Sequence, residues 1–262
     1  MGEPRDTIAD MLRSVHDRAE LAALLRKDSA LHAYELGDLD DFFWPYTTWY
    51  RHDDAVALLY HGQETPTLLA FADPEPLADL LRALTPLLPR VFYSHLSPGA
   101  EAALRPAFAR DPHTGGPHLK MVLDRLAGDV TPEGDVLTVA DRDELERLYA
   151  EAYPGNWFDP RMLETGQYVG VRRAGRIVAV AGVHVWSPEY RVSAIGNVTT
   201  HPDHRGHGLA GRVTAALCHL LRRTTDVISL NVRADNAAAI AVYERLGFVP
   251  TAGYDEATYR IA

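Results

Sequence analysis

A glycine-rich junction between a strand and a helix, around Gly206 and Gly208, constrains the fold of this chain more than any other segment. β-forming residues run up to Thr200, and helix-forming residues run from about 206 to 223. Glycine lets the backbone turn with positive φ and come close to a ligand. The first N–H groups of a helix have no internal acceptor and lie at the positive end of its dipole. The junction therefore predicts a site for phosphate or pyrophosphate within an α/β fold.

The charges around this junction differ from those of the rest of the chain. The whole sequence has 26 basic and 36 acidic side chains, a formal net charge of −10. Residues 191–223 nevertheless hold five arginines and a single acid, Asp203. A chain this acidic is a poor match for a broad nucleic-acid interface, whereas the basic segment suits one small anion. We therefore expect no nucleic-acid partner.

Composition and the first residues narrow the class of protein and its compartment. Hydrophobic residues make up 47% of the chain and charged residues 24%, as in ordinary globular proteins. Cys218 is the only cysteine, which excludes a disulfide framework. The N-terminus lacks a signal-peptide pattern, Gly2 lacks a myristoylation context, and no apolar run of about 18 residues is present. We expect a cytoplasmic protein with no membrane partner.

A polar segment with Gly and Pro, residues 127–134, is interpreted as a linker. It would separate an N-terminal α/β domain, residues 1–126, from a C-terminal domain, residues 135–262. Residues 1–125 carry 12 basic and 19 acidic side chains, and residues 126–262 carry 14 and 17. Most of the acidic excess therefore lies in the N-terminal part.

The N-terminal part alternates short strand and helix patterns. Helices are expected at 17–27, 30–40, 74–84 and 98–109. Strands are expected at 55–60, 67–71, 91–95 and 119–123. The aromatic segment 41–50 is interpreted as a packed connection under the sheet, or else as a wall of a substrate pocket or a domain interface.

The C-terminal part has a clearer pattern. Strands are expected at 136–139, 168–172, 176–186, 190–200 and 227–232 and from 248 onward. Helices are expected at 206–223 and 236–246, and after Asp141, with Glu144 as the partner in a capping box. This order predicts an α/β fold of the α+β type, a mixed sheet with helices on both faces.

The junction allows two interpretations. In the first, Gly206, Gly208 and Gly211 match the dinucleotide fingerprint G-x-G-x-x-G, and Asp235 follows about where a ribose-binding acid stands. This interpretation predicts an NAD(P)-binding oxidoreductase. However, the fingerprint should follow its strand directly and open a doubly wound domain. Here residues 201–205 intervene, and only about 50 residues remain.

A coenzyme A site is the second interpretation, and two motifs support it. The first, R-x-x-G-x-A, comprises Arg205, Gly208 and Ala210. The second, N-x-x-A-x-x-x-Y-E-x-L-G-F, runs from Asn236 to Phe248. With one strand between them, they resemble the GNAT superfamily of N-acetyltransferases over residues 135–262. The N-terminal part more weakly resembles the smaller, degenerate acetyltransferase-like half of two-domain members.

The resemblance implies the GNAT fold in the C-terminal part and an acyl-CoA-dependent N-acyltransferase activity, with acetyl-CoA as the expected donor. A primary amine on a small molecule or peptide would attack the acyl group directly in a ternary complex, so that no enzyme nucleophile is needed. The resemblance implies no metal, and a monomer or a homodimer. The residues that it implies for coenzyme binding are Val198, Thr199, Thr200, Arg205, Gly206, His207, Gly208, Leu209, Ala210, Asn231, Asn236 and Tyr243.

Two catalytic roles follow from the same resemblance. Tyr243 would be the general acid, because a phenol with an ordinary pKa near 10 suits a departing thiolate. Many relatives have a glutamate that acts as the general base on the strand before the junction, but residues 191–198 contain no acid. Glu164 is named as a possible base, and the other open candidates are Asp159, His184 and Glu189, or a chain of waters.

The histidines and the cysteine near the junction are interpreted as structural. His201, His204 and His207 are spaced three apart, but Pro202 and the glycines make a turn there, unlike the helix face of zinc proteases. Cys218 lies among alanines and leucines and is expected in the core. A third function stays open, a non-catalytic acyl-CoA-binding module that binds acetyl-CoA without releasing its thiol.

Overall fold

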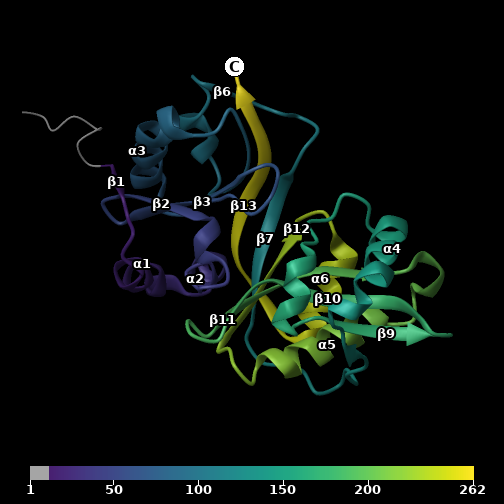
Figure 1. The fold of residues 1–262 in the computed structure, drawn as a ribbon. Coiled ribbons are helices and arrows are strands. Elements are labelled where there is room, and N and C mark those ends of the chain that lie inside the picture. Colours follow the sequence, from purple (N-terminus) through teal and green to yellow (C-terminus); the bar gives the residue numbers. More distant parts are fainter. Residues whose placement is uncertain (1–11) are drawn as a thin grey trace, which may run out of the picture. The chain divides into compact units, whose positions relative to one another are not determined.

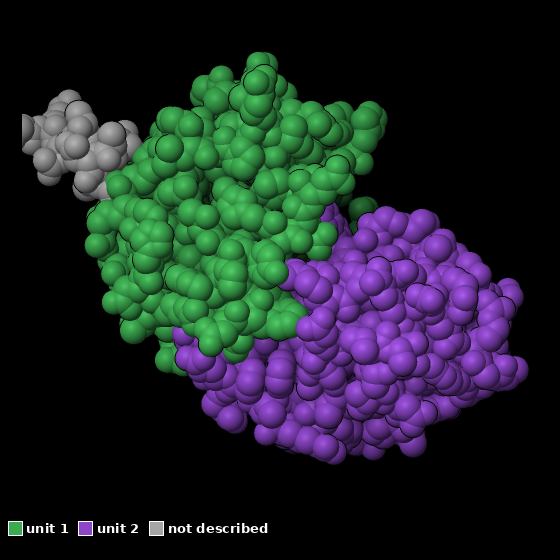
Figure 2. Space-filling view, in the orientation of Figure 1, with its two compact units in different colours: residues 1–119, 233–235, 252–262 green, residues 120–232, 236–251 purple. Residues whose placement is uncertain are grey.

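The computed structural model describes residues 12–262, which form two compact units (Figure 2). The first unit comprises residues up to 119 together with 233–235 and 252–262, and the second comprises 120–232 and 236–251. Strands β7 (Gly116–Leu123) and β13 (Phe248–Ile261) contribute residues to both units. The linker proposed at 127–134 falls within the second unit, and its role as a domain boundary stays a prediction.

The sheet of the first unit follows the order β1-β2-β3-β4-β5-β13, with β6 also paired to β13. These pairs are antiparallel, except that β4 and β5 are parallel. The strands are β1 (Arg13–Ser14), β2 (Thr47–His52), β3 (Ala55–Tyr60), β4 (Thr67–Ala70), β5 (Val91–Leu96) and β6 (Phe108–Arg110). The helices are α1 (Arg18–Leu25), α2 (Ala33–Gly37) and α3 (Pro74–Leu84) (Figure 1).

Helix α3 supplies the core of this unit. Leu77, Leu80, Leu81 and Leu84 recur at helical spacing and are fully buried against β3, β4, β5 and β13. Burial of each such leucine stabilises the fold by about 2 kcal/mol. Proline at the first position of α3 is compatible with the free N–H groups of a helix start.

The strand order of the same mixed sheet continues as β13-β7-β12-β11-β10-β9-β8, and most of these strands belong to the second unit. Strands β11 (Val192–Thr200) and β12 (Val227–Arg233) are parallel. Strands β8 (Asp135–Val136), β9 (Val169–Arg173) and β10 (Arg176–Ser187) join β11 in antiparallel pairs. Seven successive buried residues in β10, 177–183, indicate that both faces of this sheet are covered, as the sequence predicts.

Three helices pack in the second unit. They are α4 (Arg142–Ala152), α5 (Leu209–Leu221) and α6 (Ala237–Leu246). Helix α5 packs on β9, β10 and β11 and also contacts α6, whereas α4 contacts β10 and β11 (Figure 1). The strand and helix pattern of the C-terminal part is therefore confirmed to within a few residues at most boundaries.

Three local predictions are wrong. The helix expected at 98–109 is a short 3₁₀ turn, Ala100–Ala103, followed by β6, because Gly99 has a φ of 83° and Pro106 interrupts further helix. Of the helix expected at 30–40, only the short helix α2, Ala33–Gly37, forms. The capping box pairs Thr138 with Asp141, while Glu144 accepts a hydrogen bond from the N–H of Ile177.

The aromatic segment 41–50 is partly a strand, since β2 begins at Thr47. Phe43 and Trp49 are 2% and 1% exposed, so the packed interpretation holds for these side chains. Trp44 stacks on Trp49 with ring centroids 6.3 Å apart, and the guanidinium of Arg18 lies over the Trp44 ring.

The signal-peptide and myristoylation predictions concern residues outside the part of the chain that the structure describes. Within residues 12–262, no helix combines the length and the apolar character needed to cross a membrane.

Candidate functional site

The parallel pair β11–β12 opens before its strands end. The two strands are in register from Val192 opposite Val227 to Ile195 opposite Leu230, and the pairing stops there. Residues 196–200 and 231–233 continue as strand without pairing to each other. Apart from the carbonyls of Asn197 and Thr200, which accept hydrogen bonds from Tyr149 and Arg205, the backbone groups on the facing edges are therefore available to an extended ligand.

A β-bulge at Asn197 accompanies this opening. Against β10, Gly196 is opposite Gly182 and Thr199 is opposite Val180, so two residues of β11 stand opposite Ala181 alone. Asn197 has a φ of 54°, a left-handed conformation that asparagine tolerates better than most residues. The bulge reorients the backbone of β11 where the pairing with β12 ends.

Buried side chains hold the bulge in place, and they are not among the site residues predicted from the sequence. The hydroxyl of Tyr149 on α4 donates to the carbonyl of Asn197 at 2.9 Å. The amide of Asn197 donates to the hydroxyl of Tyr168 at 3.2 Å, and that hydroxyl in turn donates to Val183 O. Burial raises the pKa of Tyr168. The signal was present in the glycine that precedes Asn197, because a Gly-Asn pair inside a strand pattern suggests a bulge.

Two buried polar atoms of the opened strands have no hydrogen-bond partner within the described part of the chain. They are the hydroxyl oxygen of Thr200 on β11 and the amide nitrogen of Asn231 on β12. Buried polar groups in proteins are almost always hydrogen-bonded, and exceptions often mark a place for a ligand. Both residues belong to the predicted coenzyme set, together with Val198 and Thr199 of the same strand segment.

The turn after β11 presents a row of unbonded N–H groups. Gly206 and Gly208 have φ values of 79° and 73°, as the sequence predicts, and α5 begins at Leu209. The N–H groups from Gly206 to Ala210 donate to no acceptor among the described residues. Unbonded N–H groups at the start of a helix are the kind of group that can bind an anion.

Arg205 makes its hydrogen bonds within the protein. Its N–H donates to Pro202 O, and its side chain donates to Thr200 O at 3.1 Å and to Ala152 O at 3.3 Å. The guanidinium thus joins the C-terminus of α4 to the end of β11. The unbonded row therefore begins at Gly206, one residue later than the predicted set.

The second motif forms α6 and its entrance. Asn236 is the N-cap, and its side-chain oxygen accepts a hydrogen bond from the N–H of Ala239 at 3.1 Å. Tyr243 is 8% exposed and its ring lies 6.0 Å from that of Phe248. Burial raises the pKa of Tyr243, so its phenol keeps its proton at neutral pH.

The candidate bases differ in their surroundings. Glu164 is exposed on a 3₁₀ segment, Pro160–Thr165, without a hydrogen bond or ion pair to the described residues. Asp159 caps that segment and pairs with Arg161. His184 on β10 packs its ring against Gly196, where a Cβ would come within 1.9 Å of the imidazole. His184 thus lies beside Gly196, the first residue of β11 after its pairing with β12 ends.

Two histidines of the turn and Cys218 contact other parts of the protein. His201 Nε2 lies 3.1 Å from Glu151 on α4, and the rings of His201 and His204 are 5.9 Å apart. Across residues 12–262, no group of three or more His, Cys, Asp or Glu side chains is arranged to hold a metal ion. Cys218 is fully buried, as expected, and burial raises its pKa to about 12.

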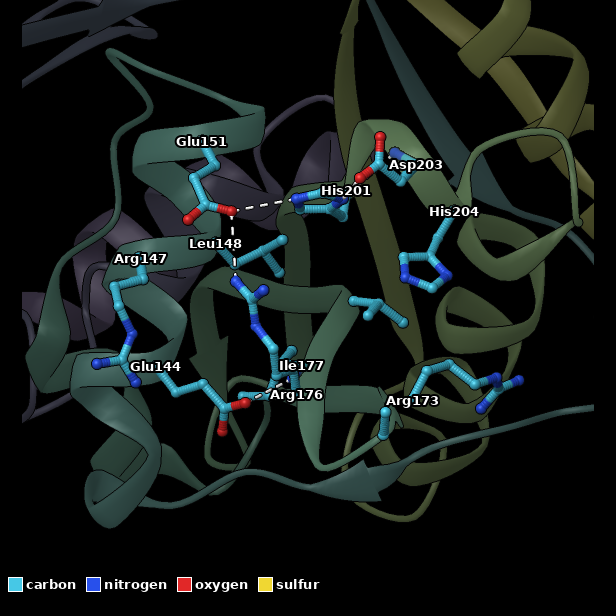
Figure 3. A pocket seen from close by; sticks show the side chains of 12 residues that line it. Glu144, Arg147, Leu148, Glu151, Arg173, Arg176, Ile177, His201, Asp203 and His204 are labelled. Atoms are coloured by element: carbon cyan, nitrogen blue, oxygen red, sulfur yellow. Dashed lines mark hydrogen bonds and ion pairs between the residues drawn. The ribbon is translucent and has the colours of Figure 1, made fainter.

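A pocket of about 540 Å³ lies beside the same turn (Figure 3). Glu151 faces both His201 and Arg176 in it, so that α4 is joined to the turn and to the β9–β10 hairpin. Its basic side chains are matched by acidic ones, which gives the pocket no clear preference for an anion. The acidic and arginine side chains that line the pocket are Glu144, Glu151, Asp203, Arg147, Arg173 and Arg176.

The dinucleotide interpretation does not fit this topology. A 3₁₀ turn, Pro202–His204, separates β11 from the glycines. Strands β11 and β12 are parallel, but the pairs from β8 to β11 are antiparallel. The fingerprint of Gly206, Gly208 and Gly211 is expected in a doubly wound parallel sheet with the glycines directly after the strand.

Comparisons with known proteins agree with this site. The model of the Acetyltransferase (GNAT) family matches residues 137–248. The N-alpha-acetyltransferase RimI of Mycobacterium tuberculosis is 32% identical over 123 residues, which cover 43% of this chain and 75% of the relative. A mycothiol acetyltransferase of Streptomyces coelicolor is 37% identical over 122 residues, covering 45% of this chain and 34% of the relative. The chain thus spans about a third of the mycothiol acetyltransferases that it matches.

Solved structures extend the similarity in fold to most of the chain. A Drosophila protein aligns with a TM-score of 0.70 at 16% identity, covering 95% of this chain and 98% of that one. A tandem GNAT protein from the clavulanic acid biosynthesis pathway aligns with a TM-score of 0.54 at 17% identity, covering 95% and 97%. A putative acetyltransferase from Novosphingobium aromaticivorans aligns with a TM-score of 0.54 at 26% identity, covering 74% and 84%.

Proposed function

This chain belongs to the GNAT acetyltransferase family, and from that premise we propose that it is an acyl-CoA-dependent N-acyltransferase with acetyl-CoA as donor and a primary amine as acceptor. One observation carries the proposal. The opened strand pair and the unbonded N–H row lie in succession along residues 196–210. An extended chain ending in a pyrophosphate needs this combination of partners in this order.

The residues of the second unit fit an acyl-CoA in three places. Backbone groups of residues 198–200 pair with the amides of the extended pantetheine arm. The amide of Asn231 and the hydroxyl of Thr200, which have no partner among the described residues, would hydrogen-bond to polar atoms of the acyl end. The N–H groups from Gly206 to Ala210 would hold the pyrophosphate. The side chain of Arg205 supports the turn by its hydrogen bonds to Thr200 O and Ala152 O. When bound, the coenzyme supplies an activated acyl thioester.

Proton transfer then falls to two side chains. Tyr243 holds a proton on its phenol oxygen in a buried position, from which it can be donated to a thiolate. We assign acceptance of the amine proton to His184 in preference to Glu164. His184 packs at Gly196, where the strands separate, whereas Glu164 is exposed and makes no hydrogen bond or ion pair with the described residues. Proximity of the amine to the acyl carbon supplies much of the rate.

Titration calorimetry on the full chain tests the donor. Acetyl-CoA should bind with a micromolar Kd, and NADH and NADPH should give no saturable heat. Binding of NAD(P)H without acetyl-CoA would overturn the proposal. Binding of acetyl-CoA without thiol release for any amine would identify a non-catalytic binding module.

Substitution of Gly208 with valine should weaken acetyl-CoA binding by about 10- to 100-fold, since a β-branched residue in the left-handed region is strained by about 1–3 kcal/mol. The Cβ would meet open space, so the effect comes from the backbone of the turn. Gly99→Val is the matched control, because Gly99 has a φ of 83° and open space in the first unit. It should leave the Kd for acetyl-CoA unchanged. Equal losses in both variants would contradict the assignment of the turn.

A further inference from the structure

The pocket of about 540 Å³ in the second unit contains charged side chains that the coenzyme proposal does not use (Figure 3). Its walls are helix α4, the β9–β10 hairpin and the 3₁₀ turn Pro202–His204 that follows β11. Leu148, Ile177 and Val178 also line it and are almost fully buried, so they form an apolar floor. None of the described residues that line it belongs to the coenzyme set predicted from the sequence.

Most charged side chains of this pocket already have a partner of opposite charge. Glu151 on α4 lies 3.5 Å from Arg176 and 3.1 Å from Nε2 of His201. Two other side chains form ion pairs with residues outside the pocket, Glu144 with Arg172 and Arg173 with Glu133. A ligand would have to break these pairs to use the same charges. The acidic and arginine side chains that remain are Asp203 and Arg147.

His201 does not neutralise Asp203. Its Nδ1 accepts a hydrogen bond from the N–H of Asp203 at 3.2 Å, so the ring proton is on Nε2, which donates to Glu151. The nitrogen that lies 3.8 Å from the Asp203 carboxylate therefore carries no hydrogen. Within residues 12–262 this carboxylate has no hydrogen bond and no other ion pair. The turn thus presents an acid whose charge the protein leaves unbalanced.

Arg147 on α4 is the opposite case, a cation without a counterion. Its side chain is exposed, lines the pocket, and makes no hydrogen bond or ion pair with any described residue. Figure 3 shows Arg147 and Asp203 on opposite sides of the pocket. A guanidinium binds a carboxylate through two parallel hydrogen bonds, and a carboxylate binds an ammonium group. The pocket therefore has one anchor for each sign of charge, with apolar surface between them.

We propose that this pocket binds a small zwitterion whose ammonium and carboxylate groups stand at the two ends of an apolar chain, as in an ω-amino acid. The carboxylate pairs with Arg147, the ammonium pairs with Asp203, and the methylene groups lie on Leu148, Ile177 and Val178. A simple anion would leave Asp203 unbalanced, and a simple cation would leave Arg147 unbalanced. Small-molecule sites combine an apolar lining with a few polar groups in this way, and the volume is within their usual range.

Calorimetry on the full chain without coenzyme tests the proposal with 6-aminohexanoate. Hexanoate and hexylamine are probes of the same chain length that each lack one of the two charges. The zwitterion should bind at least about 10-fold more tightly than either, because each probe loses one charge-assisted hydrogen-bond pair. Norleucine, whose two charged groups share one carbon, should also bind more weakly. Equal affinity for any of the three probes, or no saturable heat with millimolar 6-aminohexanoate, would overturn the proposal.

Substitutions assign the two ends. Arg147→Gln should raise the Kd for 6-aminohexanoate at least about 10-fold and abolish its advantage over hexylamine, since the carboxylate loses its partner. Asp203→Asn should raise the Kd similarly and abolish the advantage over hexanoate. Arg142→Gln is the matched control, because Arg142 is exposed on the same helix and pairs with Glu146 outside the pocket. It should leave the Kd unchanged.

The affinity for acetyl-CoA separates this site from the transferase proposal. Arg147→Gln should leave that affinity unchanged, because the pocket shares no residue with the coenzyme set. A matching loss of acetyl-CoA binding in Arg147→Gln would assign the pocket to the coenzyme and overturn the proposal. Unchanged binding of 6-aminohexanoate in folded Arg147→Gln and Asp203→Asn variants would also contradict it.

Discussion

Replacement of Tyr243 with phenylalanine should lower kcat for acyl transfer from acetyl-CoA by about 10²–10³-fold, within the range of general acid catalysis. Tyr243 is buried on α6, and burial raises the pKa of its phenol, so the phenol is protonated at neutral pH but is a weaker acid than an exposed tyrosine. The ring itself stays in place in the variant. Acetyl-CoA affinity should therefore change by less than about threefold, which steady-state kinetics and calorimetry together measure.

A second tyrosine serves as the control for this substitution. Tyr259 on β13 is 2% exposed in the first unit, and its ring stacks on Phe92. Tyr259→Phe should leave kcat unchanged, although both substitutions remove one buried hydroxyl. If Tyr243→Phe lost coenzyme affinity and kept its kcat, Tyr243 would be a binding residue only.

His184→Gln should lower kcat/KM for the amine by about 10²–10⁴-fold, because the deprotonation of the amine loses its acceptor. Glutamine keeps polar atoms beside Gly196 but cannot accept a proton. Added imidazole should restore part of the activity in this variant and have no effect on wild type. Such rescue distinguishes a lost proton acceptor from a disturbed β10–β11 pair.

Two controls accompany this prediction. His219→Gln on the exposed side of α5 should have no effect, and Glu164→Gln should lower activity by less than about threefold. A large loss in Glu164→Gln together with normal activity in His184→Gln would return the role of base to Glu164. Equal, small effects in both would favour a chain of waters.

Local chemistry explains which parts of the fold can be predicted from the sequence. The glycine turn and the cap at Asn236 follow from residues adjacent in the chain, so Gly206, Gly208 and Asn236 have the conformations that the pattern indicates. The failed helix at 98–109 shows the limit of the same reasoning. Its alanines favour a helix, but Gly99 and Pro106 confine it to one short 3₁₀ turn.

The candidate site depends on contacts that no local pattern contains. The opening between β11 and β12 results from a register that ends at Ile195, and the bulge at Asn197 depends on Tyr149 and Tyr168, which are 48 and 29 residues away in the chain. The surroundings of Glu256 give a second example. Its carboxylate accepts hydrogen bonds from Tyr93 and Tyr254 and lies 3.4 Å from the imidazoles of His95 and His118, and these residues come from three different strands.

The most direct test of the central proposal is a thiol-release assay with acetyl-CoA and a panel of primary amines and amino-terminal peptides. At least one amine should accelerate release of free coenzyme A by 10²-fold or more over the rate without amine, with one acetylated amine formed per thiol. Tyr243→Phe should abolish most of this acceleration. Saturable acetyl-CoA binding with no amine-dependent thiol release across the panel would contradict the proposal that this chain is an N-acyltransferase.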